Sequence, residues 1–492
     1  MSEHIQCALI SHTNNGKTTL ARTLIGADVG EVRDAAHVTQ LAESHALLKT
    51  AEGDTLSLWD TPGFGDSVRL LRRLELSGNP VGWFLREVFD RYRDKPLWLS
   101  QQALRTAKES ADVILYLVNS AEPPQDAGYL PPEMKILAWM GKPVLVLLNQ
   151  LGPPRPAAAE QADQQRWEDY MRAYPVVRAV LPLDAFARCW VHERVFYEAV
   201  GRVLEPGRQA GYARLLAQWA SDNEARFAAA MQVTATHLLA AARDSEPVEA
   251  GDSGLLHSAM KVVGLGQSAE RQRHDKAMAA MIERLEAHIA ITTGELLALH
   301  RIDPGKAAKL NARVQQNFKV RAPLDKAQAG LLGAVVSGAA TGLGADLMAG
   351  GLTFGAGALL GGVVGALTMA GAAWGFNTST DRNRTTIAFA DDFLRTLFIG
   401  SMLRYLAVAH FGRGRGDFVE SEAPAFWQDE VEAALAAQNL DLAQLWQSAR
   451  QESDPAPAQT RIALCLTGVA RHVLHRLYPV ALPGGQAISK EP

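Results

Sequence analysis

The chain has 492 residues, a formal net charge of −4 at pH 7 and a hydrophobic fraction of 48%. A single hydrophobic core rarely organises this length, so we expect roughly three domains. The composition argues against a disordered chain, and the small negative charge gives no global reason to expect a nucleic-acid partner; none is predicted.

The N-terminal segment predicts a buried strand, a tight polar loop and a helix start over residues 5–20. The loop reads S-x-x-x-x-G-K-T, so Ser11 replaces the usual first glycine of a phosphate-binding loop. In such a loop, backbone N–H groups cradle phosphate oxygens, Lys17 reaches the outer phosphates and the Thr18 hydroxyl binds magnesium. The predicted nucleotide-binding residues here are Ser11, Asn14, Asn15, Gly16, Lys17, Thr18 and Thr19.

A β-hairpin is predicted next, because two short apolar runs flank Glu52-Gly53-Asp54. Its second strand ends in Asp60-Thr61-Pro62-Gly63, a D-x-x-G motif about forty residues after the phosphate loop. Asp60 would hold magnesium through water, and the N–H of Gly63 would bond the γ-phosphate. The two motifs together predict a P-loop GTPase domain.

Apolar runs at 113–118, 143–148 and about 176–181 alternate with helical patterns, and a helix to about residue 203 follows. Such runs predict an α/β fold, a doubly wound and mostly parallel sheet with helices on both faces. Ligands bind at the carboxyl ends of such strands. Asn149 follows the second run and Ala185 follows the third, so both are predicted to contact the nucleotide.

These motifs resemble the Era/septin-type GTPases, a 50S-ribosome-binding-GTPase-like domain whose loop commonly reads G-x-x-N-x-G-K-[ST]. The resemblance implies GTP or GDP with Mg²⁺ as cofactors, and hydrolysis of GTP to GDP and phosphate. Asn14 matches an asparagine that holds a potassium ion in several members, which makes K⁺ a further candidate cofactor. Thr39 is the best match to the switch threonine, although a solvated loop threonine is the alternative. The expected catalytic residues are Lys17 and Thr39, and the expected magnesium ligands are Thr18, Thr39 and Asp60.

Two departures from that family matter. Phe64 stands where Ras-like proteins place a water-orienting glutamine, which predicts slow hydrolysis or dependence on a partner, a dimer or a monovalent ion. The base-reading motif N-K-x-D is replaced by Asn149-Gln150-Leu151-Gly152, so a charge-assisted pair with guanine worth roughly 1.5–3 kcal/mol is absent. Guanine preference therefore rests on the resemblance, and it stays open whether Asn149 reads the base or only ends a strand.

The domain plan continues with helical segments. We expect the GTPase domain to span 1–203 and to carry a helical insertion at 66–111 that relays switch movement. Helical periodicity replaces the strand pattern from about residue 205, which predicts a helical domain at 204–328. C-terminal helices at 381–482 and a disordered tail at 483–492 complete the plan.

The segment 329–380 carries one charge, Asp346, and its glycines recur every four residues. Small residues at that spacing allow close helix–helix approach, so a Gly-rich apolar helical hairpin is predicted. Its length fits membrane contact at the cytoplasmic face of the inner membrane, while tight packing inside the protein is the alternative.

We expect a reducing compartment, because the three cysteines, Cys7, Cys189 and Cys465, are far apart in the sequence. We also expect a cytoplasmic start, because Met1–His4 does not begin an apolar leader. The chain resembles bacterial GTPases that carry a helical C-terminal domain of unknown function. Our first hypothesis is a slowly hydrolysing GTP switch that controls a membrane-associated helical region. A nucleotide-stabilised membrane scaffold and an ATP-using P-loop protein are the alternatives. The expected partners are a guanine nucleotide, a membrane, and a membrane protein or a second copy of the chain.

Overall fold

The computed structural model describes residues 2–25, 43–61, 63–75, 91–151, 157–183, 190–248, 265–302, 376–381, 384–410 and 426–478. The chain divides into two compact units. One is built around Met1–Ala225, and the other around Arg226–Val408 and Ala425–Val473. Each unit is described separately below. Thr39, Ala185, most of the segment 329–380 and the tail 483–492 lie outside the described residues.

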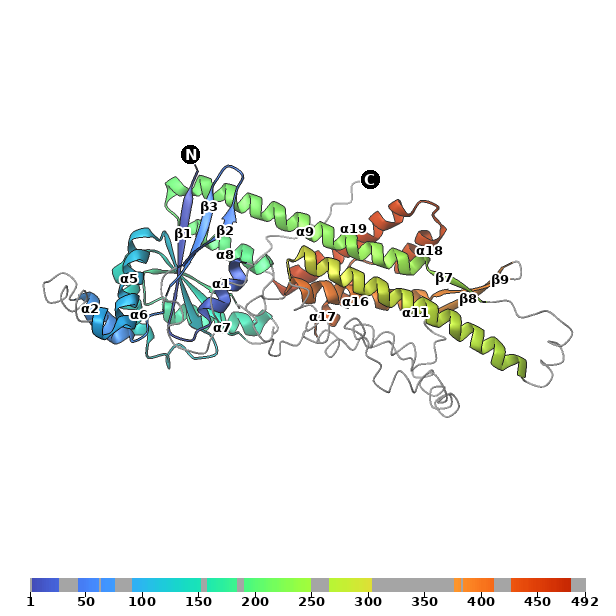
Figure 1. Ribbon diagram of the computed structural model, residues 1–492, viewed down its shortest axis with the longest axis horizontal. Helices are drawn as coiled ribbons and strands as arrows, with labels where there is room; N and C mark the ends of the chain where they lie inside the picture. Colours follow the sequence, from blue (N-terminus) through green and yellow to red (C-terminus); the bar gives the residue numbers. More distant parts are fainter. Residues whose placement is uncertain are drawn as a thin grey trace. The chain divides into compact units, whose positions relative to one another are not determined.

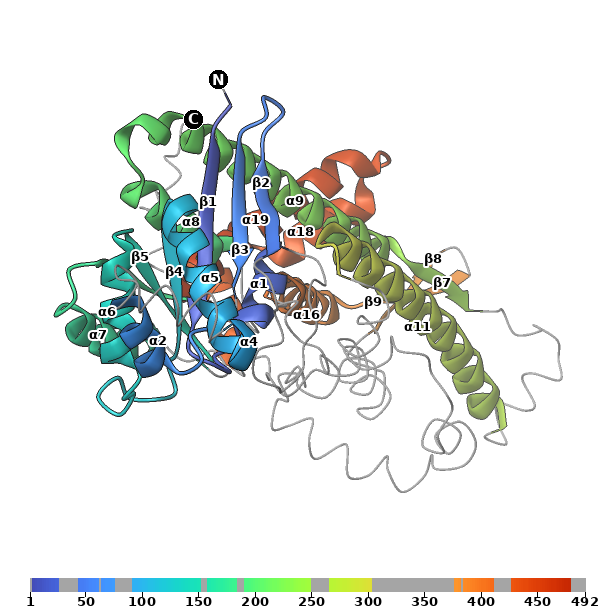
Figure 2. The same cartoon turned by 60° about the vertical axis from the view of Figure 1, so that its left-hand side comes forward.

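The first unit contains a six-stranded sheet of order β2-β3-β1-β4-β5-β6. Its strands are β1 (His4–Ser11), β2 (Glu43–Lys49), β3 (Thr55–Asp60), β4 (Val113–Asn119), β5 (Val144–Asn149) and β6 (Val177–Pro182). All neighbours pair in parallel except the β2–β3 hairpin, which is antiparallel. In the middle of this sheet β1 lies between β3 and β4, as Figure 2 shows, and Figure 1 gives a second view of the sheet. The predicted α/β fold with its N-terminal hairpin is confirmed.

Helices cover both faces of the sheet. Successive residues of a strand point to opposite faces, so neighbouring residues of one strand pack against different helices. Cys7 and Leu9 of β1 pack with the helices on one face, and Ala8 and Ile10 pack with those on the other. The first face is covered by α1 (Lys17–Ile25), α8 (Trp190–Val203) and the start of α9 (Gln209–Arg243). The second face is covered by α2 (Ser67–Glu75), α5 (Lys95–Ser110), α6 (Leu130–Met140) and α7 (Ala157–Met171). A single turn, α4 (Arg91–Arg93), precedes α5.

The start of α9 is fastened to the edge of the sheet where β1, β3 and β4 begin. The Arg214 guanidinium donates to both carboxylate oxygens of Asp54, at 2.7 and 2.8 Å, and holds the pKa of that carboxyl well below its usual range. The Arg208 guanidinium donates to Asp112 Oδ2 at 2.9 Å. Since α9 runs on past Ala225, one continuous helix contributes residues to both units.

The second unit is mainly helical, as predicted. Its helices are the rest of α9, α11 (Leu265–Leu299), α16 (Asp391–Ala409), α17 (Phe426–Ala437), α18 (Leu442–Gln451) and α19 (Pro455–Leu477). It also contains an antiparallel sheet of order β7-β9-β8, formed by Ser245–Val248, Arg384–Phe389 and Phe376–Asp381. Helices do dominate after residue 205, as predicted, but these three strands were not predicted. The strand β7 is short and polar and pairs with residues about 140 positions later, so no local pattern marks it.

The predicted apolar hairpin needs one correction. Residues 376–380 belong to β8, which pairs with β9, and not to a helix. The uncharged side chains that made this stretch look like a helix end are mostly threonine, serine and asparagine, which a strand accommodates. Among the helices that the structure describes, none is both long enough and apolar enough to cross a bilayer.

Candidate functional site

The phosphate loop connects β1 to α1 and turns through two left-handed residues. Asn14 has φ 67° and Gly16 has φ 82°, a region that glycine and asparagine enter at least cost. The first turn of α1 closes when the Leu20 N–H donates to the Gly16 carbonyl at 2.9 Å. The free N–H groups at the start of this helix point toward the loop, which is the geometry that binds phosphate.

Lys17 and Thr18 meet Asp60 at the carboxyl end of β3. The Lys17 ammonium forms an ion pair with Asp60 Oδ1, and the Thr18 hydroxyl donates to Asp60 Oδ2 at 3.4 Å. The β3 end is fixed beside β1, since the Thr61 hydroxyl donates to the Leu9 carbonyl at 2.8 Å. A hydroxyl and a carboxylate side by side are oxygen ligands of the kind that Mg²⁺ prefers. The side chains present therefore fit a phosphate–magnesium unit.

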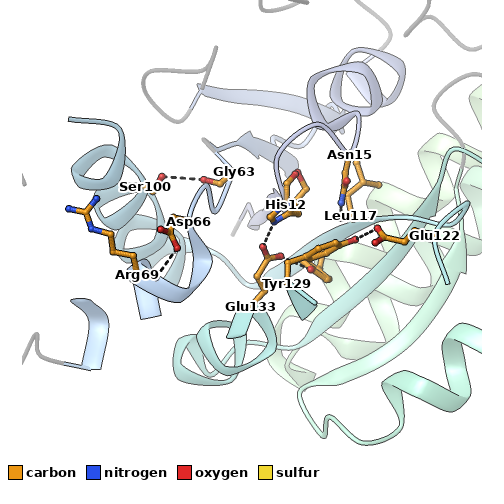
Figure 3. A network of polar contacts seen from close by, with 12 residues as sticks. His12, Asn15, Gly63, Asp66, Arg69, Ser100, Leu117, Glu122, Tyr129 and Glu133 are labelled. Atoms are coloured by element: carbon orange, nitrogen blue, oxygen red, sulfur yellow. Dashed lines mark hydrogen bonds and ion pairs between the residues drawn. The ribbon is translucent and has the colours of Figure 1, made fainter. Parts of the chain in front are cut away.

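Gly63 lies directly against the phosphate loop. A Cβ at this position would stand 2.9 Å from the carbonyl oxygen of Ser11, so only glycine fits without a backbone shift. The next residue, Phe64, donates its N–H to the same carbonyl at 3.1 Å. On the other side, the Ser100 hydroxyl of α5 donates to the Gly63 carbonyl at 3.2 Å, as Figure 3 shows. The D-x-x-G motif thus links the loop to α5.

The Phe64 side chain is part of the hydrophobic core. It is 1% exposed and packs edge-on against Tyr116, with ring centroids 6.1 Å apart. The side chain at the position of the Ras-like glutamine is therefore used for packing. A nearby arginine is also engaged: Arg69 of α2 forms an ion pair with Asp94, the residue that caps α5.

Asn149, at the carboxyl end of β5, reaches across to the loop. It is fully buried, and its Nδ2 donates to the carbonyl of Asn15 at 2.8 Å. A Cβ on Gly16 would approach the same Nδ2 to 2.6 Å, which gives Gly16 a second reason to be glycine besides its positive φ. Asn15 in turn donates to the Leu117 carbonyl of β4 at 3.3 Å. Asn149 therefore does more than end a strand, since it supports the loop.

A polar network behind the loop was not predicted. His12 Nδ1 lies 2.7 Å from Glu133 Oε1, and the Tyr116 hydroxyl donates to Glu133 Oε2 at 2.6 Å. The His12 ring also stacks on Tyr129, with centroids 4.2 Å apart and an interplanar angle of 14°. Figure 3 shows His12 between Glu133 and Tyr129. The network fastens the second residue of the loop to β4 and α6.

Glu133 is a carboxyl group with no exposed surface. Burial raises its pKa, and the hydrogen bonds from Tyr116 and His12 oppose that shift. Burial together with the neighbouring Glu122 raises the pKa of Tyr129 to about 12. The only signal in the sequence is an acidic residue in the first turn of an otherwise apolar helix, because His12 and Glu133 are 121 residues apart.

Most of the predicted site residues are brought together. Ser11 to Thr19, Asp60, Gly63 and Asn149 lie at the carboxyl ends of β1, β3 and β5, in or beside the loop. Thr39 and Ala185 lie outside the described residues, and so does Gly152 of the base-reading motif. Their roles, and the nucleotide contacts of the others, stay predictions.

Comparison with protein-family models gives two matches. Residues 6–150 match the model described as 50S ribosome-binding GTPase, and residues 175–463 match the model of a domain of unknown function, DUF3482. The first match covers the phosphate loop, the D-x-x-G motif and Asn149, and it confirms a GTP-binding P-loop GTPase domain. A comparison with curated proteins gave no match.

Several solved structures are similar to part of the chain. Era in complex with MgGDPNP and a segment of 16S ribosomal RNA is 20% identical, with 42% of this chain and 58% of that chain covered and a TM-score of 0.29. A variant of Era from Aquifex aeolicus bound to GDP and AlF₄⁻ is 17% identical, with 51% and 75% covered and a TM-score of 0.30. The chain thus spans little more than half of the first Era chain.

The second family match covers more than half of the chain, and it includes the last strand of the sheet, α8 and most of the helical unit. That unit is mainly helical, as the sequence resemblance led us to expect. The protein belongs to the DUF3482 family and carries a P-loop GTPase domain at its N-terminal end.

Proposed function

We propose that the protein is a GTP-dependent switch that binds GTP with Mg²⁺, hydrolyses it slowly and passes the change of state to its helical region. The contact of Gly63 with the phosphate loop supports this most directly. Its backbone has no room for a side chain, and both neighbours of the contact, Ser11 and Ser100, are hydrogen-bonded to residues 63–64. A rearrangement at the γ-phosphate would therefore have to move α5 or the loop.

The binding step follows from the charges at the loop. The Lys17 ammonium would contact the outer phosphates while Thr18 and Asp60 would hold Mg²⁺, which neutralises phosphate charge when bound. The α1 N-terminus adds N–H donors and the positive end of the helix dipole. In this scheme Thr39 closes over the metal site in the GTP state, K⁺ binds beside Asn14, and Asn149 contacts the base.

Slow hydrolysis is supported by the position of Phe64. Its ring is held in the core against Tyr116, and a phenyl ring carries no group that could orient water. Arg69, which could otherwise stabilise the charge of a transition state, is paired with Asp94. We therefore expect a partner, a second copy of the chain or a monovalent ion to accelerate turnover.

The test is a comparison of GTP, ATP and XTP in binding and turnover assays, each with K⁺ or with Na⁺. We expect GTP to bind most tightly, turnover to be slow, and K⁺ to raise it. Lys17→Ala should abolish both binding and turnover, since it removes the cation at the phosphates. Tight GTP binding with no turnover under any condition would instead favour a nucleotide-stabilised scaffold.

We also propose that the segment 329–380 brings the helical region to an anionic membrane surface in one nucleotide state. Its long uncharged runs on either side of Asp346 support this. Flotation of the full-length protein with anionic liposomes, in the apo, GDP and GTP-analogue states, tests the idea. Recovery of the protein only at the bottom of the gradient in all three states would contradict it.

A further inference from the structure

Three helices of the second unit, α9, α11 and α16, share a buried face. His237 of α9 and His288 of α11 approach to 6.5 Å between ring centroids. The Tyr405 ring of α16 lies 5.8 Å from the Phe227 ring of α9 and 6.1 Å from the ring of His300, the residue that follows α11. Each helix therefore touches the other two, and Figure 1 shows the three running alongside one another.

Several polar groups on this face have no hydrogen-bond partner in the part of the chain that the structure describes. Arg404 of α16 is 3% exposed, and its buried Nε and Nη1 donate to nothing there. His237 is 2% exposed, and both of its ring nitrogens also lack a hydrogen-bond partner in the described part of the chain. The Ser401 hydroxyl, also unpartnered, lies one turn before Arg404 on the same side of α16.

The charges around these groups have one sign. Burial, followed by Arg404 and then His288, lowers the pKa of His237, so the guanidinium and the two imidazoles act on one another. Burial alone lowers the pKa of Arg404 to about 10, and no described carboxylate contributes to it. The cluster formed by His237, Ser401 and Arg404 is thus a set of buried donors without a described anion.

This arrangement contrasts with the rest of the same unit. Arg284 pairs with Asp244 at 2.8 Å, and Arg450 pairs with Asp391 at 2.7 Å. Buried hydroxyls on these helices bond carbonyls four residues earlier, as Thr293 does to Ile289 at 2.7 Å. A buried ionised group normally has a counter-ion, since leaving it alone in a protein interior is strongly destabilising. Arg404 and His237 depart from this pattern, because both are buried and neither has a described counter-ion.

We propose that His237, Ser401 and Arg404 form a binding site for the phosphate group of an anionic ligand. A guanidinium presents parallel N–H donors that match two oxygens of a phosphate. The serine hydroxyl and an imidazole N–H supply donors for the remaining oxygens, and three donor groups from two helices suit a tetrahedral oxyanion better than a planar carboxylate. Free phosphate and a phospholipid headgroup share this chemistry. The site is separate from the GTPase loop and does not depend on the proposed switch.

The test uses the full-length protein with saturating GDP and Mg²⁺, so that added phosphate does not compete for the GTPase loop. Inorganic phosphate should raise the midpoint temperature of thermal unfolding. Above the dissociation constant, the midpoint should rise in proportion to the logarithm of the phosphate concentration. Arg404→Met keeps most of the side-chain volume and should weaken phosphate binding about 10- to 100-fold, the effect of a lost charge-assisted hydrogen bond. Arg284→Met is the matched control, because Arg284 lies in the same unit but is already paired. It should keep the phosphate response even if its starting midpoint is lower.

Two further arms identify the source of the phosphate. If vesicles containing anionic phospholipid bind the wild type but not Arg404→Met, and free phosphate gives no shift, the ligand is a lipid headgroup and the proposal stands. Lys17→Ala should leave the phosphate shift unchanged, which separates this site from the GTPase loop.

Two results would overturn the proposal. One is a wild type that responds to neither phosphate nor vesicles while Arg404→Met is more stable than wild type. The other is a dependence of the Asp346→Asn effect on Arg404. In that case Asp346→Asn would lower the free energy of unfolding in the wild-type protein but not in the Arg404→Met variant. That coupling would make the chain's own carboxylate the counter-ion of Arg404.

Discussion

Replacing Glu133 by alanine removes the acceptor that joins the phosphate loop to the core. The substitution leaves the buried Tyr116 hydroxyl without its partner at 2.6 Å and releases His12 Nδ1 from its partner at 2.7 Å. An unsatisfied buried hydroxyl costs about 1–3 kcal/mol, and a hydrogen bond to a charged group contributes about 1.5–3 kcal/mol. Relief from burying a carboxyl offsets part of this. We expect Glu133→Ala to lower the free energy of unfolding by about 2–4 kcal/mol.

Glu133→Gln is the informative comparison. Its amide oxygen can accept from Tyr116, and its amide nitrogen can donate to His12, so both contacts survive and the loss should stay below about 1 kcal/mol. Glutamine cannot titrate, however. Any pH-dependent difference between wild type and Glu133→Gln therefore reports the Glu133 carboxyl together with its coupling to His12, because titrating groups that do not interact with Glu133 cancel.

The sign of that difference follows from burial. The pKa of Glu133 is raised in the folded protein, while the unfolded chain titrates near the ordinary value of about 4.3. Between these two values the folded state holds a proton that the unfolded state has lost, so unfolding becomes easier as pH rises. The stability of wild type relative to Glu133→Gln should be greatest below about pH 4 and should decline as pH rises through the folded-state pKa.

Urea unfolding of the wild type and the two variants at a series of pH values measures these differences, and binding of a fluorescent GDP analogue measures the effect on the loop. Glu133→Ala should weaken GDP binding, and His12→Ala should add little to it because both act through the same contact. Two results would refute the reasoning. One is a difference in unfolding free energy between wild type and Glu133→Gln that does not change between pH 4 and 8. The other is a Glu133→Gln variant as unstable as Glu133→Ala.

Three further substitutions test other contacts. Gly16→Ala should greatly weaken the binding of the fluorescent GDP analogue, because Gly16 has φ 82° and a Cβ there would lie 2.6 Å from Asn149 Nδ2. Gly128→Ala is the control and should not weaken binding, because a Cβ at Gly128 meets open space. Phe64→Gln should lower the free energy of unfolding in urea by about 3 kcal/mol or more, because it places an amide in the hydrophobic core. It should not speed GTP turnover, because the side chain at this position is held in the core. Faster turnover would show that this side chain is not fixed there. Arg214→Met should destabilise the protein above pH 4 and matter less as pH falls, because the hydrogen bond from Arg214 is the largest cause of the depressed Asp54 pKa. An equal loss of stability in acid would contradict this.

The GTPase fold could be predicted because its signals are local. The helix after the loop begins at Lys17 and ends at Ile25, as the pattern indicates, and the strand that carries Asp60 stands where the apolar run places it. A phosphate loop needs particular residues at fixed spacing, so its chemistry is written in consecutive positions. The helix α18 carries a similar local signal within the predicted helical range 381–482, since an Asp441 cap precedes Leu442, Leu445 and Trp446.

The remaining parts depend on contacts between distant residues. The strand β7 has four residues and includes Pro247, so its pairing with β9 is set by the surrounding fold rather than by its own sequence. The sequence around Glu133 does not distinguish it from an acid on the surface of a helix, and only the fold reveals that it is buried against His12 and Tyr116. Buried polar groups of this kind are invisible to periodicity, because periodicity identifies faces by their apolar members.

The supports of the loop explain how a local motif could act at a distance. Ser11 is joined to the segment after β3, His12 to Glu133 of α6, and Asn15 to Asn149 of β5. Each support ends on a different part of the unit, and two of them end on residues with no exposed surface. A loop tied on three sides cannot follow a departing γ-phosphate by itself, since its partners would be left with unmet hydrogen bonds. The segment after Gly63 is joined to the loop through the Phe64 N–H and to α5 through the Ser100 hydroxyl and the Arg69–Asp94 ion pair. We therefore expect a movement at Gly63 to pass to α5.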